Sequence, residues 1–151
     1  ALGYLTHDHS RVGVNIETAH AILAGLDPSD EMGFALAYDK LYTVHLNDQN
    51  GLKFDEDRSF GAINLRSAFN QVRILEKHNY GQRGEYVGLD VKAMRTQRQD
   101  AATKHLSNSR TIFLKLVELA RSLDQTQVDQ LVAERDYEAL EMMIIDHLLG
   151  G

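Results

Sequence analysis

Three short apolar segments, each separated from the next by helical sequence, constrain the fold of this chain more than any other feature. The segments are 11–16 (RVGVNI), 41–46 (LYTVHL) and 85–91 (EYVGLDV), and all have the composition and alternation of strands. Strands that are separated by helices pair in parallel through crossover connections. The sequence therefore predicts an α/β protein with a parallel sheet.

The helices are predicted from apolar periodicity and from capping residues. Thr18 is expected to cap the first helix, and Ser29 or Asp30 the second. A strongly amphipathic helix is expected to start at Asn64 or at the Gly61 turn and to end near Asn79, and in the long helix that follows Leu106 is expected to face inward. The expected helical segments are 19–25, 30–38, 64–79, 100–122, 128–134 and 137–149.

Three parallel strands alone would leave two open edges and little core. They are better accommodated in a larger sheet, most simply a (β/α)8 barrel, in which functional side chains lie at the carboxyl ends of the strands. Glu17 follows the first strand, His45 lies near the end of the second and Asp90 lies near the end of the third. We therefore expect these three side chains to meet at one rim.

Two pairs of residues near this rim have the spacing of metal ligands. Glu17 and His20 are three residues apart at a helix start and share one face, whereas Asp55 and Asp57 would point the same way in an extended segment. Taken alone, the first pair is better explained by an exposed helix start and the second by a solvated acidic loop. An EF-hand loop starting at Asp55 is excluded, because the motif requires glycine at its sixth position and Gly61 would occupy the seventh.

Because all these residues fall at one expected rim, we interpret them together as a metal site. Oxygen ligands with one or two imidazoles suit Mg²⁺, Mn²⁺ or Co²⁺ better than a thiolate-type zinc site. Two ions sharing Glu17 would polarise a carbonyl and an adjacent hydroxyl together, which is chemistry suited to sugars. The same loop offers Asn47, Asp48 and Glu56 as further potential ligands. The predicted metal ligands are Glu17, His20, His45, Asp55, Asp57 and Asp90.

Composition narrows the class of protein. The chain has 151 residues, enough for one domain, and its net charge of -6 argues against a nucleic-acid partner. No apolar run approaches the length of a membrane span, and the absence of cysteine fits a reducing compartment, so we expect a cytoplasmic protein without a membrane partner. The N-terminus has neither an initiator methionine nor a signal sequence, and we expect the chain to be part of a longer protein.

Four segments of the sequence resemble the C-terminal part of the xylose isomerase family. They are NIETAHAILAG, KLYTVHLNDQNGLKFDEDRSFG, the LDVK turn and the terminal IIDHLLG, in the family's order along nearly the whole chain. The resemblance implies the last three βα units of a (β/α)8 barrel at 1–122. A helical C-terminal arm at 123–151 would wrap a neighbouring subunit, which implies a homo-oligomer.

The resemblance also implies a role for each residue of the site. Glu17 is similar to the carboxylate that bridges two divalent ions. The ligands of the mobile, catalytic ion would be His20, Asp55 and Asp57, and Asp90 would hold the more fixed ion. His45 departs from the family pattern, which usually has aspartate there, but L-rhamnose isomerases carry histidine at the similar place. A neutral ring nitrogen at this position is expected to favour Mn²⁺ or Co²⁺ over Mg²⁺.

The family reaction interconverts an aldose and a ketose by a hydride shift between C1 and C2, with a water near Asp57 as the proton shuttle; Asp57 is therefore the expected catalytic residue. The ring-opening His–Asp pair, the aromatic pocket walls, one further carboxylate and its neighbouring lysine would lie upstream, in the remaining N-terminal part of the barrel. The chain alone is thus expected to be inactive and poorly stable. Alternatives are an L-rhamnose isomerase-like enzyme or sugar epimerase on the same scaffold, or a non-catalytic metal-binding fragment.

Overall fold

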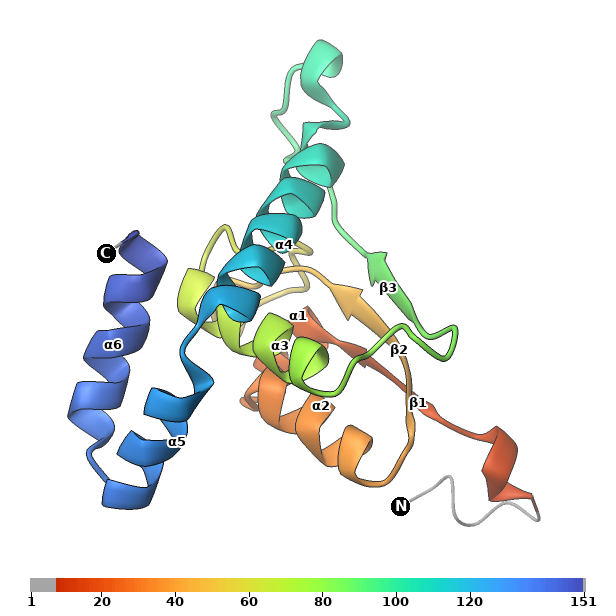
Figure 1. Ribbon diagram of the computed structural model, residues 1–151. Helices are drawn as coiled ribbons and strands as arrows, with labels where there is room; N and C mark the ends of the chain where they lie inside the picture. Colours follow the sequence, from red (N-terminus) through yellow and green to blue (C-terminus); the bar gives the residue numbers. More distant parts are fainter. Residues whose placement is uncertain (1–7, 151) are drawn as a thin grey trace.

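The computed structural model describes residues 8–150 as an α/β fold with one three-stranded sheet (Figure 1). The strands lie in the order β1-β2-β3, and both neighbouring pairs are parallel, as predicted. In chain order the elements are η2 (His9–Arg11), β1 (Val14–Glu17), α1 (Thr18–Leu23), α2 (Pro28–Ala37), β2 (Leu41–Leu46), α3 (Leu65–Lys77), β3 (Tyr86–Leu89), η3 (Gln99–Ala101), α4 (Lys104–Ser122), α5 (Gln125–Glu134) and α6 (Tyr137–Leu149).

The arrangement of strands and helices fits a segment of a (β/α)8 barrel. Helices α1 and α2 connect β1 to β2, and α3 connects β2 to β3. Figure 1 shows α2, α3 and α4 packed beside the sheet and α5 and α6 together on the far side of these helices from the strands. Within residues 8–150, β1 and β3 are both edge strands, which is the open-edged arrangement expected of three parallel strands on their own.

The hydrophobic core lies between the sheet and the helices α2, α3 and α4. Val44 and Leu46 of β2 are fully buried, because β2 is the central strand. Phe69 and Val72 of α3 lie in the same cluster and are also fully buried, as is Met32 of α2. The 13-residue α3 follows the predicted 3.6-residue period, and its start is fixed by Asn64, whose side chain accepts a hydrogen bond from the Ser67 amide.

The predicted caps of the first two helices are wrong. Thr18 does not cap α1; its hydroxyl is buried and donates to Gln71 Oε1 (2.9 Å). Glu17 occupies the N-cap position without a side-chain cap bond. Helix α2 is capped by Asp27, which accepts from the Ser29 amide (2.7 Å), and Pro28 occupies the first helical turn.

Two further predictions about the helices need correction. The long helix α4 begins at Lys104, because residues 99–101 form a short 3-10 helix instead. Leu106, in its first turn, is 41% exposed rather than inward-facing, whereas Leu116 and Val117 further along the helix are buried. Strand β1 starts three residues later than predicted and includes Glu17, which was expected to follow it. Strand β3 is shorter than predicted, whereas β2 and α6 have the predicted bounds.

Helices α5 and α6 pack against α3 and α4. Ile144 of α6 and Val128 of α5 are buried in the main core cluster. The Arg66 guanidinium of α3 donates two hydrogen bonds to Glu141 of α6 (3.0 and 2.8 Å). His147 Nε2 lies 2.8 Å from the Leu119 carbonyl of α4. A contact of these helices with a neighbouring subunit stays a prediction.

None of the helices within residues 8–150 has the length and apolar character needed to cross a membrane.

Candidate metal centre

The carboxyl ends of the three strands bring the first group of potential ligands together. In the parallel register Glu17 of β1 is the partner of His45 in β2, and Asp90 follows directly after β3. The His45 Nδ1 atom lies 3.5 Å from Asp90 Oδ2. One ligand atom from each of Glu17, His45 and Asp90 lies within 4.8 Å of the others, which is close enough for one cation to bind all three.

A second group forms where α1 meets the loop after β2. His20 Nε2 lies 3.2 Å from Glu17 Oε1 and 3.5 Å from Asp55 Oδ2. The His20 imidazole reaches Glu17 because residues three apart at a helix start share one face. Ligand atoms of Glu17, His20 and Asp55 again lie within 4.8 Å of one another. The two groups therefore meet at Glu17, whose side chain is only 15% exposed.

The carboxylate of Asp55, in the second group, is only partly satisfied by the protein's own hydrogen-bond donors. Its Oδ1 atom is buried and has no hydrogen-bond partner in the described part of the chain. A buried carboxylate oxygen without a partner is costly, because its lost hydration is not replaced. A cation bound to this oxygen would offset that cost.

Asp57 lies beside these groups but in neither of them. Its backbone has φ 45, so the residue is not in the extended conformation that was expected to align it with Asp55. The side chain is buried, accepts a hydrogen bond from Asn47 Nδ2 (2.9 Å) and forms an ion pair with Lys92 Nζ. Lys92 Nζ also lies 3.9 Å from Asp55 Oδ2, so the two aspartates do face one cation, the lysine ammonium.

Lys92 is a residue of this site that sequence reasoning did not identify. The hydrogen bond to Asp57 raises its pKa, and the negative charges of Asp57, Asp55 and Asp90 act in the same direction. The available signal was its position two residues after the strand-end carboxylate Asp90, in the LDVK turn. Lys92 thus neutralises part of the negative charge that the carboxylates concentrate here.

The other polar residues of the loop support the site rather than join the ligand groups. Asp48 is 4% exposed, and its carboxylate accepts hydrogen bonds from the amides of Gln49 (2.9 Å), Ile63 (2.8 Å) and Asn64 (3.0 Å). Its backbone pairs with that of Arg58 and closes the loop. The suggestion that Asp48 is a further ligand is therefore wrong, because its oxygens are already used by backbone amides.

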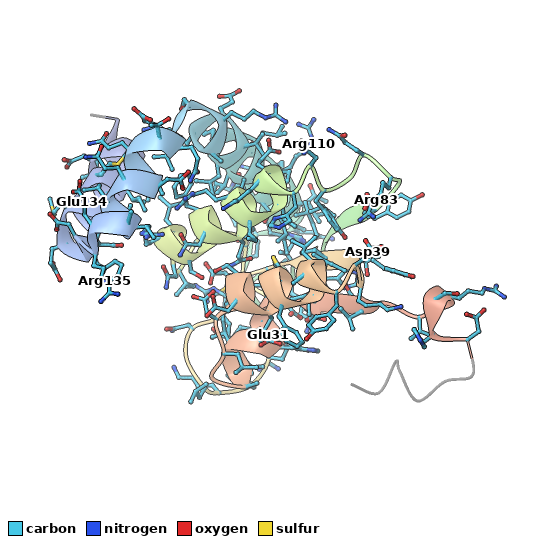
Figure 2. All side chains as sticks on the ribbon, turned by 60° about the horizontal axis from the view of Figure 1, so that its bottom comes forward. Glu31, Asp39, Arg83, Arg110, Glu134 and Arg135 are labelled. Atoms are coloured by element: carbon cyan, nitrogen blue, oxygen red, sulfur yellow. The ribbon has the colours of Figure 1, made fainter. Side chains whose placement is uncertain are left out.

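A glycine on β3 leaves room for His45. Gly88 is the register partner of His45, and a Cβ atom added to Gly88 would lie 3.2 Å from His45 Cδ2. Such a contact is tight for packed side chains, so a larger residue at 88 would displace the imidazole. Both ligand groups lie at the carboxyl end of the sheet. The opposite end carries the ion pair of Arg83 and Asp39 (2.7 Å), which Figure 2 shows side by side.

The fold and the site together define an α/β protein whose parallel sheet carries, at its carboxyl edge, two carboxylate–imidazole groups that share Glu17. No family model matches the chain. The chain is 30% identical over 177 aligned residues to a xylose isomerase of Streptomyces lividans, in an alignment that covers 92% of this chain and 44% of the relative. It is 34% identical over 125 residues to a xylose isomerase of Thermus thermophilus, covering 82% of this chain and 31% of the relative. The chain is therefore related to the xylose isomerase family, and it spans less than half the length of these two relatives.

Proposed function

We propose that this chain carries most of the metal ligands of a metal-dependent aldose–ketose isomerase of the xylose isomerase type. The observation that carries the proposal is the sharing of Glu17 between two ligand groups, each with one further carboxylate and one imidazole. A shared carboxylate is the arrangement that places two cations close enough to act on adjacent substrate oxygens. The relationship to xylose isomerases supports a sugar as the substrate.

The residues present fit two divalent ions. Glu17, His45 and Asp90 would hold the fixed ion, and Glu17, His20 and Asp55 the mobile one, which Asp57 would join by exchanging Lys92 for the ion. Carboxylate oxygens with a single imidazole suit Mn²⁺, Mg²⁺ or Co²⁺. The unpartnered Oδ1 atom of Asp55 supports a cation at this carboxylate.

When bound, the two ions would supply Lewis-acid polarisation of the substrate carbonyl and of the neighbouring hydroxyl. In the proposed reaction a hydride moves from C2 to C1 of the open-chain aldose, and the proton of the C2 hydroxyl passes to the oxygen on C1. Asp57 is the group that holds the water through which this proton moves, which makes it the proposed catalytic residue. In the absence of metal, Lys92 holds the position beside Asp57 that the mobile ion would take.

We further propose that 1–122 are the last three βα units of a (β/α)8 barrel and that 123–151 are a C-terminal helical arm. The open edges of β1 and β3 would then pair with strands of the remaining N-terminal part of the barrel. That part would also supply the ring-opening residues and the walls of the sugar pocket. The arm would join subunits of a homo-oligomer, and the enzyme would act in the cytoplasm.

His45 favours a second candidate on the same scaffold. It lies in the first ligand group, where the xylose isomerase pattern has aspartate, and histidine at the similar place is typical of L-rhamnose isomerases. An L-rhamnose isomerase-like enzyme or a sugar epimerase therefore stays open as an alternative. A third possibility, a metal-binding fragment without catalysis, is an outcome of the test below.

The test is aldose–ketose conversion by the full-length protein with Mn²⁺ and with a chelator, on a panel of pentoses, hexoses and deoxyhexoses. We expect Mn²⁺-dependent conversion that Glu17→Gln abolishes, since the substitution removes the shared charge. Glu118→Gln is the matched control, because Glu118 is exposed on α4 and outside both ligand groups. Metal binding without aldose–ketose conversion or epimerisation of any sugar on the panel would leave only the metal-binding fragment. Absence of binding of Mn²⁺, Mg²⁺ and Co²⁺ would refute all three proposals.

A further inference from the structure

Asn47 links the two sides of the candidate metal centre. It lies one residue after β2, and it is completely buried. Its Nδ2 atom donates to Asp57 Oδ1 (2.9 Å) and approaches Glu17 Oε1 (3.3 Å). Its Oδ1 atom accepts a hydrogen bond from the Ala19 amide of α1 (2.6 Å). All three contacts reach elements that carry proposed ligands.

These partners determine how the amide of Asn47 is oriented. Only an oxygen can accept from the Ala19 N–H, so the carbonyl oxygen faces α1. The two N–H bonds must then point to the other side, where both neighbours are carboxylates. Each of these carboxylates receives a donated hydrogen bond on one oxygen, which fixes its orientation and leaves its remaining oxygen for other partners.

Asn47 also explains why Glu17 is available to the site. Glu17 occupies the N-cap position of α1 but makes no side-chain cap bond. The Asn47 side-chain carbonyl supplies the acceptor for the first turn of α1 instead, although Asn47 lies after β2 and 28 residues beyond Ala19 in the chain. The Glu17 carboxylate is therefore not used to cap the backbone of α1 and can face both ligand groups.

We propose that Asn47 is a positioning residue that fixes the carboxylates of Glu17 and Asp57 for binding of two divalent ions. This inference rests on the proposed function. Glu17 is the ligand shared by the two groups, and Asp57 is the proposed proton-handling residue, so one buried amide sets the geometry of both. Hydrogen-bond donors behind metal ligands are typically worth 10- to 100-fold in metal affinity.

The experiment compares Asn47→Ala and Asn47→Asp in the full-length protein. Mn²⁺ affinity is measured by calorimetric titration, and the absorption spectrum of bound Co²⁺ reports ligand geometry at saturation. We expect Asn47→Ala to weaken Mn²⁺ binding about 10- to 100-fold. Asn47→Asp keeps an acceptor for the Ala19 amide but turns an oxygen toward two carboxylates, so we expect a changed Co²⁺ spectrum even in a well-folded variant.

Asn64→Ala is the matched control. Asn64 caps α3 through its own side-chain oxygen and has no bond to a ligand side chain, so its loss costs helix stability without disturbing the site. The inference is overturned if the Asn47 variants bind Mn²⁺ with wild-type affinity and give the wild-type Co²⁺ spectrum, or if Asn64→Ala changes both equally. If the wild-type protein binds neither ion, the proposed function and the inference fail together; normal binding in the wild type and in both Asn47 variants defeats the inference alone.

Discussion

Replacing His45 by aspartate tests whether this residue is a metal ligand. His45→Asp places a third carboxylate in the group formed with Glu17 and Asp90, whose ligand atoms lie within 4.8 Å of one another. At that separation and an effective dielectric constant of about 20, two unit charges repel by about 3.5 kcal/mol. The side chains of His45 and Asp90 are 40% and 47% exposed, so water screens much of this repulsion. We expect the metal-free variant to be less stable by about 1–2 kcal/mol.

A divalent ion should reverse this effect, because the added charge becomes an added ligand. The donor set changes from two carboxylates and an imidazole to three carboxylates, which favours the harder ion Mg²⁺ relative to Mn²⁺. We expect the ratio of the Mg²⁺ to the Mn²⁺ dissociation constant to fall at least about tenfold, equivalent to about 1.4 kcal/mol. Calorimetric titration of both ions into full-length wild type and variant measures the ratio, and thermal unfolding without metal measures the repulsion.

Gln82→Glu is the control for added charge alone. Gln82 precedes β3 at the end of the sheet opposite to the ligand groups, so its substitution adds the same charge without adding a ligand. We expect no change in the metal preference of this variant. Identical Mg²⁺ and Mn²⁺ affinities in wild type and His45→Asp would show that His45 does not bind the ion.

Three further predictions concern stability. Ile144→Ala should lower the free energy of unfolding by about 2–5 kcal/mol in a denaturant titration, because Ile144 is 1% exposed and its loss leaves a cavity between α6 and the core. Arg66 holds the pKa of Glu141 below its ordinary 4.5, so this pair stabilises the fold above pH 4.5 and the contribution is lost as pH falls through the lowered pKa. The coupling energy from a double-mutant cycle should therefore be larger at pH 7 than at pH 3. Burial, followed by the charge of Glu85, raises the pKa of Tyr80 to about 12, so the contribution of Tyr80 to stability is complete below pH 10 and is lost as pH rises through 12. The phenolate absorbance that Tyr80→Phe removes should titrate near pH 12. A titration midpoint near pH 10 would contradict the burial of Tyr80.

The sequence by itself determined the elements whose signals are local. Strand β2 and helix α6 have the predicted bounds, and Asn64 caps α3, because alternation, periodicity and a cap depend on residues within a few positions of one another. Parallel pairing of the strands also followed from their order, since helical connections leave no other arrangement. The meeting of Glu17, His45 and Asp90 follows from that pairing and was predicted.

Only the tertiary structure decided which polar residues face the site and which support it. Asp48 has the residue type and position of a metal ligand in the sequence, but its carboxylate accepts hydrogen bonds from backbone amides. The sequence marks Lys92 only weakly as a site residue, yet it pairs with Asp57. Thr18 is a residue type that often caps helices, yet the side chain that accepts a hydrogen bond from the Ala19 amide in the first turn of α1 is that of Asn47, 28 residues away. The physical reason is the same in each case. A buried polar atom must find its partner wherever the chain path and the strand register bring one, and neither can be read from the neighbouring sequence.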